Sequence, residues 1–458
     1  MTKLTTLPND TKDLFSKQAT WQSWLMVEGA LAQAQGETGM IPLAASTEIR
    51  RHMRIEDYDL DALEAEITQS MSPVMAIVRA MAARCDGDAG GYVHWGATTQ
   101  NIIITGKMLQ LRKAHALTLE RLGRCLTLLS DMARKTADWP TISRTNRRQA
   151  LPITFGYKVA GWIDEFQRCV ERLIEVEKRT FVLTFGGASG AMHSYGPDGF
   201  ALSAKLANIL GLEVSAVHSR ATNDGLGEYV AVLGLLAVAC ERMGNELYTL
   251  MANEFGEVFE KQSENVVGSS TMPHKTNPKY VVALLAESAH LRNMVAPALE
   301  ACRPSHEGDA AFNFRLYDLL DAAGISAYGV VTRLETLLTH LECDKAAMYR
   351  NLMINPAPLM SEKIMLELAK STGRQNAHDI VHHAIVVSER DAISFADALW
   401  QEKEVSSHFK DKTALADLLD PATYTGCSAE IAAKLANAGA ESAEMVAKHT
   451  RKLSGQDI

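Results

Sequence analysis

Residues 228–255 read EYVAVLGLLAVACERMGNELYTLMANEF, and this stretch decides the fold class. Its apolar residues fall on almost every face of a helix, and about 28 residues at about 1.5 Å each make a rod of roughly 42 Å. A helix that is apolar on several faces must be covered on several sides. We therefore expect this segment inside a bundle of long helices.

Four other windows share this helical spacing of apolar residues, and they lie at 109–137, 155–179, 281–301 and 313–343. They are rich in Ala, Leu, Glu, Met and Arg, and the few prolines sit mostly between them. The sequence therefore predicts an all-α protein with five long central helices. Such rods bury all of their apolar stripes only if subunits associate, so we expect a homo-oligomer.

Three domains are expected along the chain. Residues 1–104 hold shorter helices with an acidic surface, residues 105–355 hold the long helices, and residues 356–458 hold shorter windows after the sequence Asn-Pro-Ala-Pro. Within the central domain, FGGASG at 185–190 concentrates glycine and small residues. This composition predicts a turn where two backbone segments approach closely.

Composition excludes several classes of function. The formal net charge is -9, and Lys and Arg are spread along the chain, so a nucleic-acid partner is not expected. No stretch approaches the roughly 20 uncharged apolar residues that span a bilayer, and the N-terminal MTKLTTLPND lacks the apolar core of a signal peptide. Seven isolated cysteines form no CxxC pair. We expect a cytoplasmic protein with no membrane partner and no zinc or redox centre.

The sequence GSSTMPHKTNP at 268–278 separates two of the long helical windows. Asn277 is suited to cap a helix, Pro278 fits a first helical turn, and Val281 begins the next apolar stripe. A helix N-terminus beside Lys275 predicts a site for a carboxylate. An ordinary Gly/Ser loop before a capped helix is the alternative reading.

This segment resembles the signature loop GSSxMPxKxNP of the aspartase/fumarase superfamily. The resemblance implies a three-domain, all-α, cofactor-free lyase that works as a homotetramer with active sites shared between subunits. It implies that Ser269 is the base that removes a carbon-bound proton beside a carboxylate. The substrate contacts that it implies in the same loop are Ser270, Met272, Lys275 and Asn277. A dianionic intermediate needs such fixed donors and a cation in a dry pocket.

A second segment, VHWGATTQN at 93–101, precedes another helical window, so its threonines can cap that helix and present donors to an anion. It is similar to the superfamily pattern HxGxTSxD, with Thr99 for Ser and Asn101 for Asp. The resemblance implies that Thr98, Thr99 and Asn101 contact the substrate. We take His94 as the group that protonates the leaving group; a hydrogen-bonded structural histidine is the alternative.

The similarity covers nearly the whole chain. It includes FGGASG, MSEKIMLELAKSTGRQNAH at 360–378 and LLDPATYTG at 418–426. Within the superfamily it points to the branch of 3-carboxy-cis,cis-muconate cycloisomerase and adenylosuccinate lyase. The expected reaction is β-elimination, with carbon–nitrogen or carbon–oxygen cleavage, on a succinyl-type or other di- or polycarboxylate substrate, giving fumarate or a related alkene. A cycloisomerase, an adenylosuccinate lyase and a non-catalytic member of the fold are the alternatives.

One departure concerns the histidine of the superfamily's RTHxQ segment, where residues 144–149 read RTNRRQ. Asn146 replaces this histidine, and an amide does not transfer protons near neutral pH. The glutamate that commonly pairs with the histidine is Val282 here. Because both halves of the pair are missing, the change indicates a branch feature of the cycloisomerase kind.

A second departure concerns arginines. Arg148 stands where the superfamily commonly has a glutamine that faces the substrate, and a guanidinium there suits a second carboxylate. The resemblance places Arg144 and Thr145 of the same segment beside the substrate; for Arg148, a solvated arginine on a helix face is the alternative. Arginines that relatives carry near Asn223 and at Gly308 are absent. Fewer cations disfavour a phosphate-bearing substrate such as adenylosuccinate.

Two residues suggest a competing function. His378 and His382 lie four apart, which is the spacing of histidines in zinc-binding HExxH helices. A metal-dependent hydrolase would rest on this pair alone. The segment lies within the stretch that resembles the superfamily's C-terminal domain, so we expect no metal site.

Overall fold

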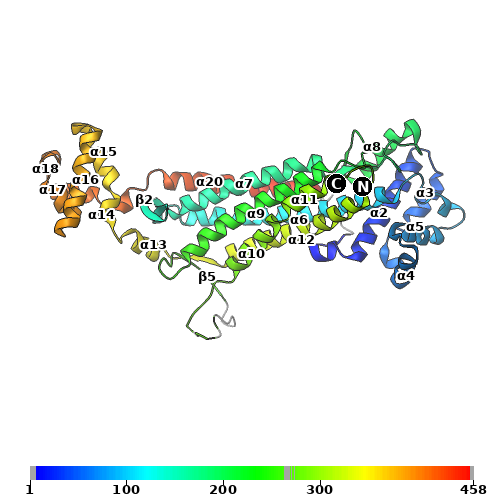
Figure 1. The fold of residues 1–458 in the computed structure, drawn as a ribbon, viewed down its shortest axis with the longest axis horizontal. Coiled ribbons are helices and arrows are strands. Elements are labelled where there is room, and N and C mark those ends of the chain that lie inside the picture. Colours follow the sequence, from blue (N-terminus) through cyan, green and yellow to red (C-terminus); the bar gives the residue numbers. More distant parts are fainter. Residues whose placement is uncertain (1–6, 263–268, 270, 273, 454–458) are drawn as a thin grey trace.

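The computed structural model describes residues 7–262, 269, 271–272 and 274–453. Its long helices form an elongated central bundle, with a group of short helices at each end (Figure 1). The strands are short and pair only in twos. The predicted all-α fold with a long central bundle is confirmed.

Five helices form the N-terminal group: α1 (Thr11–Leu14), α2 (Lys17–Glu37), α3 (Leu43–Arg50), α4 (Leu60–Ser70) and α5 (Pro73–Arg84). Short 3₁₀ turns lie at Ile55–Asp57 and Ala89–Tyr92. Helix α2 is the long member, and most of its residues are buried. It packs against α3, α6 and α8, so it joins this group to the central bundle.

The central bundle contains the predicted long helices as α6 (Thr99–Lys135), α7 (Phe155–Thr180), α9 (Asp224–Leu250), α10 (Tyr280–Arg292), α11 (Val295–Ala301) and α12 (Ala310–His340). The window at 281–301 is therefore two helices instead of one. Pro297 explains the break, because it lacks an N–H and its ring clashes with the carbonyl four residues earlier. That carbonyl belongs to Asn293, which lies between the two helices.

A sixth long helix, α20 (Ser428–Leu453), lies along α6 and α7. Close contact depends on glycine: a Cβ on Gly439 would lie 2.5 Å from Ser130 Oγ and 2.9 Å from Ile163 Cγ2. Arg112 of α6 also donates to the carbonyl of Leu453 (2.9 Å). The end of the predicted C-terminal domain thus packs on the central bundle, which its expected boundary at residue 356 did not anticipate.

The rest of the C-terminal segment contains α13 (Lys345–Leu352), α14 (Pro356–Leu359), α15 (Ser361–Thr372), α16 (Arg374–Asp391), α17 (Phe395–Gln401), α18 (Lys403–His408), α19 (Lys412–Leu418) and a 3₁₀ turn at Pro421–Thr423. From Met360 to Leu419, buried apolar residues form a hydrophobic cluster of their own. This group is therefore a small helical unit with its own core at the far end of the bundle (Figure 1).

Within the described residues, six strands connect the helices in three pairs. They are β1 (Pro140–Thr145) with β2 (Arg148–Thr154), β3 (Val182–Leu183) with β4 (Glu213–Val214), and β5 (Val258–Glu260) with β6 (Leu341–Cys343). Only the middle pair is parallel. Asn146 (φ 49°) and Arg147 (φ 63°) connect β1 to β2 in a two-residue turn with positive φ at both positions. Arg148 therefore lies on a strand and not on a helix face, but it is exposed, so the alternative of a solvated arginine stays open.

The predicted close approach at FGGASG is confirmed. A Cβ on Gly186 would lie 2.7 Å from His218 Cβ, and Gly190 has a φ of +89°. This turn leads through a 3₁₀ turn at Gly196–Asp198 into α8 (Gly199–Leu210). It brings the segment before α9 against the residues that follow α7.

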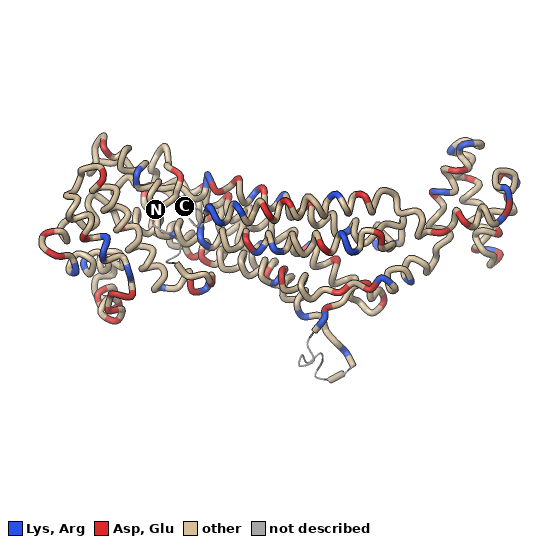
Figure 2. The backbone as a smooth tube through the Cα atoms, turned by 180° about the vertical axis from the view of Figure 1, so that it is seen from behind, with Lys and Arg blue, Asp and Glu red and all other residues tan. Residues whose placement is uncertain are grey.

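Charges of both signs are interspersed along the bundle, as Figure 2 shows. Among the described residues, no helix is long and apolar enough to cross a membrane.

Candidate active site

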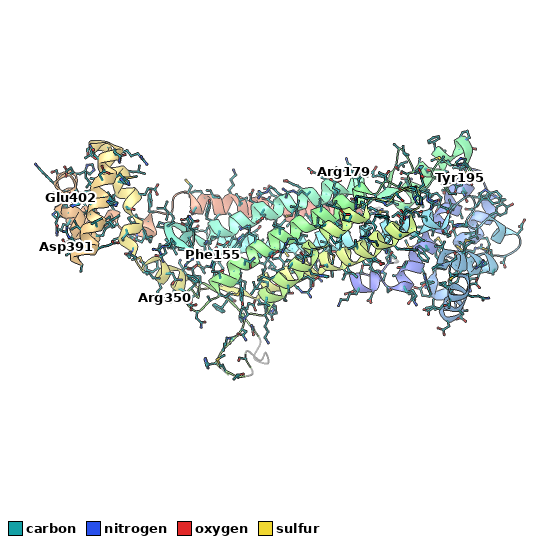
Figure 3. All side chains as sticks on the ribbon, in the orientation of Figure 1. Phe155, Arg179, Tyr195, Arg350, Asp391 and Glu402 are labelled. Atoms are coloured by element: carbon teal, nitrogen blue, oxygen red, sulfur yellow. The ribbon has the colours of Figure 1, made fainter. Side chains whose placement is uncertain are left out.

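The predicted site residues form two groups at opposite ends of the bundle. Helix α6 begins after Thr98 and ends at Lys135, just before the β1–β2 hairpin. Its 37 residues span about 55 Å at about 1.5 Å per residue. Figure 3 marks the same two ends on α7, with Phe155 near the hairpin and Arg179 at the other end. One chain therefore does not bring the two groups together.

The signature loop leaves β5 and returns to α10, and its described part stands out from the bundle (Figure 1). Ser269 Oγ accepts hydrogen bonds from the backbone N–H of Met272 (3.1 Å) and, more weakly, of Thr271 (3.4 Å). Donors that point at an oxygen favour its deprotonated form. The local geometry therefore suits Ser269 to the role of a base. Ser270 lies outside the described residues.

The N-terminus of α10 does not form the expected free carboxylate site. The helix starts at Tyr280 after Lys279, so the prediction that Asn277 caps it was wrong. Glu260 of β5 accepts from the backbone N–H groups of Lys279 (2.7 Å), Tyr280 (3.0 Å) and Val281 (2.7 Å). The protein itself thus supplies the anion at this helix end. A substrate carboxylate has to be bound elsewhere on the loop.

The other predicted loop residues lie near solvent in the single chain. Met272 and Lys275 are exposed, and the carbonyl of Met272 accepts from the backbone N–H of Lys275 (2.9 Å). Gln262 Nε2 donates to the carbonyl of Asn277 (2.8 Å). These bonds form a compact turn and tie the end of the loop to its start. The predicted contacts of Met272, Lys275 and Asn277 with substrate remain predictions.

Arg144 has a structural role in the hairpin. Its guanidinium pairs with the carboxylate of Glu257, which is fully buried, and lies 4.6 Å from the ring centroid of Phe255. Asn351 Nδ2 donates to the same carboxylate (2.9 Å). Arg144 therefore anchors β1 to the segment before β5. A direct substrate contact by this guanidinium would have to compete with a buried ion pair.

The tip of the hairpin is open to solvent. Thr145, Asn146, Arg147 and Arg148 are all exposed. Arg148 lines a hollow of about 570 Å³ between the hairpin and α14, together with Arg147 and Asn355. Two guanidinium groups at one hollow form a positively charged surface that suits a carboxylate.

At the other end of the bundle, Thr98 is the N-cap of α6 and Thr99 is its first residue. Asn101 Oδ1 accepts from the backbone N–H of Thr98 (3.3 Å), and Asn101 Nδ2 donates to the carbonyl of Thr184 (3.2 Å). Asn101 is 2% exposed. Its side chain therefore holds the start of α6 in place. Thr98 and Thr99 are half-buried, and their contacts with substrate remain predictions.

His94 precedes this cap, and its ring is 12% exposed. Its Nδ1 lies 2.6 Å from Oε1 of Glu28, which is 1% exposed. Sequence reasoning missed Glu28. A signal was present, because Glu28 is the single charged residue in the apolar stretch between Lys17 and Glu37. A lone carboxylate on a buried helix needs a partner.

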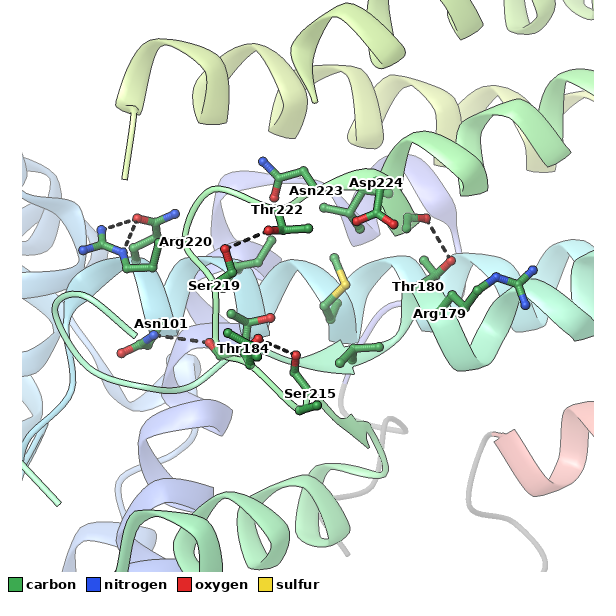
Figure 4. Close-up of a pocket in the computed structure, with 18 of the residues that line it drawn as sticks. Asn101, Arg179, Thr180, Thr184, Ser215, Ser219, Arg220, Thr222, Asn223 and Asp224 are labelled. Carbon is green, nitrogen blue, oxygen red and sulfur yellow. Dashed lines mark hydrogen bonds between the residues drawn. The ribbon is translucent and has the colours of Figure 1, made fainter. Parts of the chain in front are cut away.

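A cavity of about 580 Å³ lies next to the start of α6 and α9 (Figure 4). Arg220 lines it and bonds the side chain of Gln100 (Nε to Oε1, 2.9 Å) and the carbonyl of Ala188. The Arg220 carbonyl accepts from the N–H of Gly308 (3.1 Å), and a Cβ on Gly308 would lie 2.8 Å from Arg220 Nη2. The guanidinium thus occupies the space that a side chain at 308 would enter. Arg220 therefore places a positive charge close to position 308, where the arginine of relatives is missing.

Comparison with known proteins identifies the family. The model of a family described as "Lyase" matches residues 9–290, and one described as "Adenylosuccinate lyase C-terminus" matches residues 358–435. The chain belongs to the aspartase/fumarase superfamily of lyases. It is 34% identical to the N-acetyl-S-(2-succino)cysteine lyase of Enterococcus italicus over 91% of each chain. It is also 34% identical to the 3-carboxy-cis,cis-muconate cycloisomerase of Pseudomonas aeruginosa over 90% of each chain.

A solved structure confirms the superfamily fold. The 3-carboxy-cis,cis-muconate lactonizing enzyme of Pseudomonas putida matches with a TM-score of 0.85 and 30% identity. The match covers 94% of this chain and 97% of that one. The superfamily's enzymes are lyases and a cycloisomerase, so this chain is an enzyme of that class.

Within the superfamily, this member lacks the usual histidine–glutamate pair. Asn146 lies at the exposed tip of the hairpin, and Val282 is an exposed residue of α10. Neither side chain carries a titratable group. In the predicted elimination, the proton for the leaving group would therefore come from another residue.

The paired histidines, His378 and His382, lie about one turn apart on α16. The rings of His378 and His382 are stacked with centroids 6.3 Å apart, and Nδ1 of His378 lies 3.2 Å from Oδ1 of Asp379. In the part of the chain that the structure describes, no group of three or more His, Cys, Asp or Glu side chains is placed to hold a metal ion. The alternative of a metal-dependent hydrolase has no further support.

Proposed function

We propose that this protein is a cofactor-free lyase that eliminates the substituent from C-2 of a substituted succinate and releases fumarate. In this reaction Ser269 removes a proton from the carbon beside the far carboxylate. The bond between C-2 and its substituent then breaks, and its electron pair leaves with the substituent. The observation that carries the proposal is the pair of backbone donors on Ser269 Oγ, because they stabilise the alkoxide that such a base requires.

The carbanion formed beside a carboxylate places a second negative charge on that carboxylate. Fixed donors and a cation that stabilise this charge lower the barrier, since their interaction is stronger in the transition state than in the ground state. Lys275 and Asn277 lie on the same loop as Ser269 and are our candidates for these groups. Thr98 and Thr99 are candidates for the second carboxylate.

A complete site would need more than one chain. The loop leaves β5 on the side of the bundle that carries the β1–β2 hairpin, whereas the threonines lie at the other end of α6, whose 37 residues span about 55 Å. Two bundles packed in opposite directions would bring the loop of one chain to the threonines of another. We therefore propose that active sites are shared between the subunits of a homotetramer.

The names of two relatives support a substituted succinate as the substrate. One is the N-acetyl-S-(2-succino)cysteine lyase of Enterococcus italicus, and another is the adenylosuccinate lyase of Methanothermobacter thermautotrophicus, which is 32% identical. The first adds carbon–sulfur cleavage to the carbon–nitrogen and carbon–oxygen cleavage expected from sequence. Asn223 and Gly308 still disfavour a phosphate-bearing substrate, although Arg220 restores one cation near position 308.

The proposal is tested with a panel of succinates that carry a thioether, an amine or an ether at C-2, with fumarate read by its ultraviolet absorbance. We expect fumarate from at least one of them, and none from Ser269→Ala, whose fold and substrate affinity remain. Ser407→Ala, in the C-terminal unit, is the matched control and should keep full activity. More than a few per cent of activity in Ser269→Ala would rule out Ser269 as the base.

A cycloisomerase is the second candidate. The absence of the histidine–glutamate pair at Asn146 and Val282 indicates this branch, and the relative from Pseudomonas aeruginosa carries this activity in its name. Ring closure at a carbon beside a carboxylate is the same proton chemistry run as an isomerisation. If the panel yields no fumarate but a carboxymuconolactone is converted, the cycloisomerase replaces the succinate lyase.

A further inference from the structure

The pair formed by Glu28 and His94 lies outside the loop that carries Ser269. Oε1 of Glu28 lies 2.6 Å from Nδ1 of His94. The other carboxylate oxygen, Oε2, is buried and has no hydrogen-bond partner among the described residues. A buried carboxylate is costly unless it is hydrogen-bonded. His94 is therefore the partner that satisfies Glu28, and the pair holds the ring in place.

The turn that carries His94 is fixed on both sides. The carbonyl of Trp95 accepts from Gln35 Nε2 (2.7 Å) and from the hydroxyl of Tyr195 (3.3 Å). His94 itself adopts a φ of 63°, a conformation that non-glycine residues rarely take. Such strained residues persist where the surroundings hold them firmly, and they concentrate at functional sites.

The bond to Glu28 decides which ring nitrogen is available. Because Nδ1 donates a hydrogen bond to the carboxylate, Nε2 is the nitrogen that can exchange a proton with a bound molecule. Among the described residues, Nε2 of His94 has no hydrogen-bond partner. A carboxylate that orients a histidine is an arrangement found in other proton-transfer sites.

We infer that Glu28 is a positioning residue that holds His94 for proton transfer to the leaving group. Ser269 takes the proton from carbon, the electron pair of the breaking bond goes to the leaving atom, and the proton on Nε2 of His94 follows it. The pair thereby supplies the proton that Asn146 does not. The inference rests on the proposed elimination, because it needs a leaving group.

The test uses Glu28→Gln on a series of succinates that differ in the acidity of the leaving group, for example alkoxy- and nitrophenoxysuccinates. The leaving groups are varied within a class of substituted succinates that the wild-type protein is first shown to cleave. General acids contribute about 10²- to 10⁴-fold to rates, most where the leaving group is basic. We expect kcat to fall at least tenfold for alkoxide leaving groups and less than threefold for nitrophenolate, with KM nearly unchanged.

Two controls separate this role from a purely structural one. Glu48→Gln makes the same substitution in another glutamate–histidine pair, with His52 (3.0 Å), and should leave every rate unchanged. Gln35→Met removes a bond to the same turn without touching the carboxylate, and should lower all rates alike.

A double-variant cycle shows whether Glu28 acts through His94. In a His94→Asn background, Glu28→Gln should have no further effect on kcat. An equal fall for all leaving groups, or additive losses in the double variant, would overturn the inference. If Glu28→Gln does not fold, kcat of His94→Asn must fall more for alkoxide leaving groups than for nitrophenolate. An equal fall in kcat for all leaving groups would then overturn the inference. Wild-type release of fumarate tests the proposed function separately.

Discussion

Arg144 and Arg148 lie on opposite strands of one short hairpin, yet the structure gives them different environments. The guanidinium of Arg144 is paired with the buried carboxylate of Glu257, and that ion pair holds the hairpin in place. The side chain of Arg148 is exposed beside the hollow that Arg147 and Asn355 also line. Of the two arginines, Arg148 is therefore the one available to a second carboxylate of the substrate.

Replacing Arg148 by glutamine should weaken substrates that carry such a distal carboxylate. A charge-assisted, bidentate contact contributes about 1.5 to 3 kcal/mol, so KM should rise roughly ten- to a hundredfold. The turnover number should change little, since this carboxylate is held equally in ground and transition states. Steady-state kinetics on matched substrates with and without the distal carboxylate give the comparison.

Arg147→Gln is the matched control, because Arg147 lines the same hollow from the turn of the hairpin. A specific contact by Arg148 predicts a small and substrate-independent effect for Arg147→Gln. Equal kinetics for Arg148→Gln and the wild type on every active substrate would leave Arg148 without a role in recognition.

The resemblance to the superfamily predicted which residues lie at the site, but not which side chains they contact. The pairing of His94 with Glu28 joins residues 66 positions apart, and the pairing of Arg144 with Glu257 joins residues 113 apart. Such contacts depend on how the helices pack, and the pattern of a single segment does not contain that information. The same holds for Asn101, which matches a substrate-binding position of the superfamily. That match did not predict that its side chain bonds the backbone of Thr98 and Thr184.

Among the elements, the long helices were predictable and the hairpin was not. Apolar periodicity identified α6, α7, α9 and α12, because each must bury several faces. The turn between β1 and β2 has Arg147 where glycine is the usual residue, so its sequence lacks the common signal of a hairpin. Helix α20 was expected in the C-terminal domain and not along the bundle. Its buried residues are mostly small, among them Ala432, Ala436 and Gly439, and they allow close packing.

Helix α20 is tied to the bundle by a partly buried polar cluster. Glu177 of α7 accepts from Nε2 of His115 of α6 (3.0 Å) and from Nε2 of His449 of α20 (2.8 Å). Burial alone raises the pKa of the Glu177 carboxyl group, but the hydrogen bonds and charges of the two histidines outweigh it and lower that pKa below its ordinary value. The ionised carboxylate therefore stabilises the contact among three helices.

This cluster predicts a pH dependence of stability. A carboxyl pKa that is lower in the folded state contributes stability above the unfolded value of about 4.3, and loses it as the pH falls through the folded pKa. Glu177→Gln should thus reduce the free energy of unfolding by about 1 to 3 kcal/mol at pH 7. The difference from wild type should shrink below about pH 4.

Urea unfolding at a series of pH values measures this difference. Glu175→Gln, an exposed neighbour on α7, is the control and should track the wild type at every pH. A constant difference between Glu177→Gln and wild type from neutral to acidic pH would contradict the assignment.

At the scale of the whole molecule, the bundle exposes large apolar side chains on several helices. Leu235 and Val238 of α9 are 48% and 42% exposed, and Val282 of α10, Leu299 of α11 and Phe314 of α12 are exposed as well. A monomer gains nothing from such residues in water, whereas an interface with other copies would bury them. These helices are our candidates for the contact faces of a homotetramer.

Light scattering after size exclusion should give the mass of four chains for the wild type at micromolar concentration. Leu235→Asp should reduce that mass, because a charge in an apolar interface is strongly unfavourable. Leu366→Asp, at an equally exposed site in the C-terminal unit, should leave it unchanged. A monomeric wild type would contradict both the tetramer and the shared active site.

The contact between Arg220 and Gly308 has a consequence for engineering this part of the molecule. A Cβ at 308 would lie 2.8 Å from Nη2 of Arg220, so the flexible guanidinium would have to move aside. Gly308 also has a φ of +74°, which residues with side chains rarely adopt, so a substitution there would strain the backbone. Introducing an arginine at 308 would therefore disturb the bonds of Arg220 with Gln100 and Ala188 as well as the local backbone.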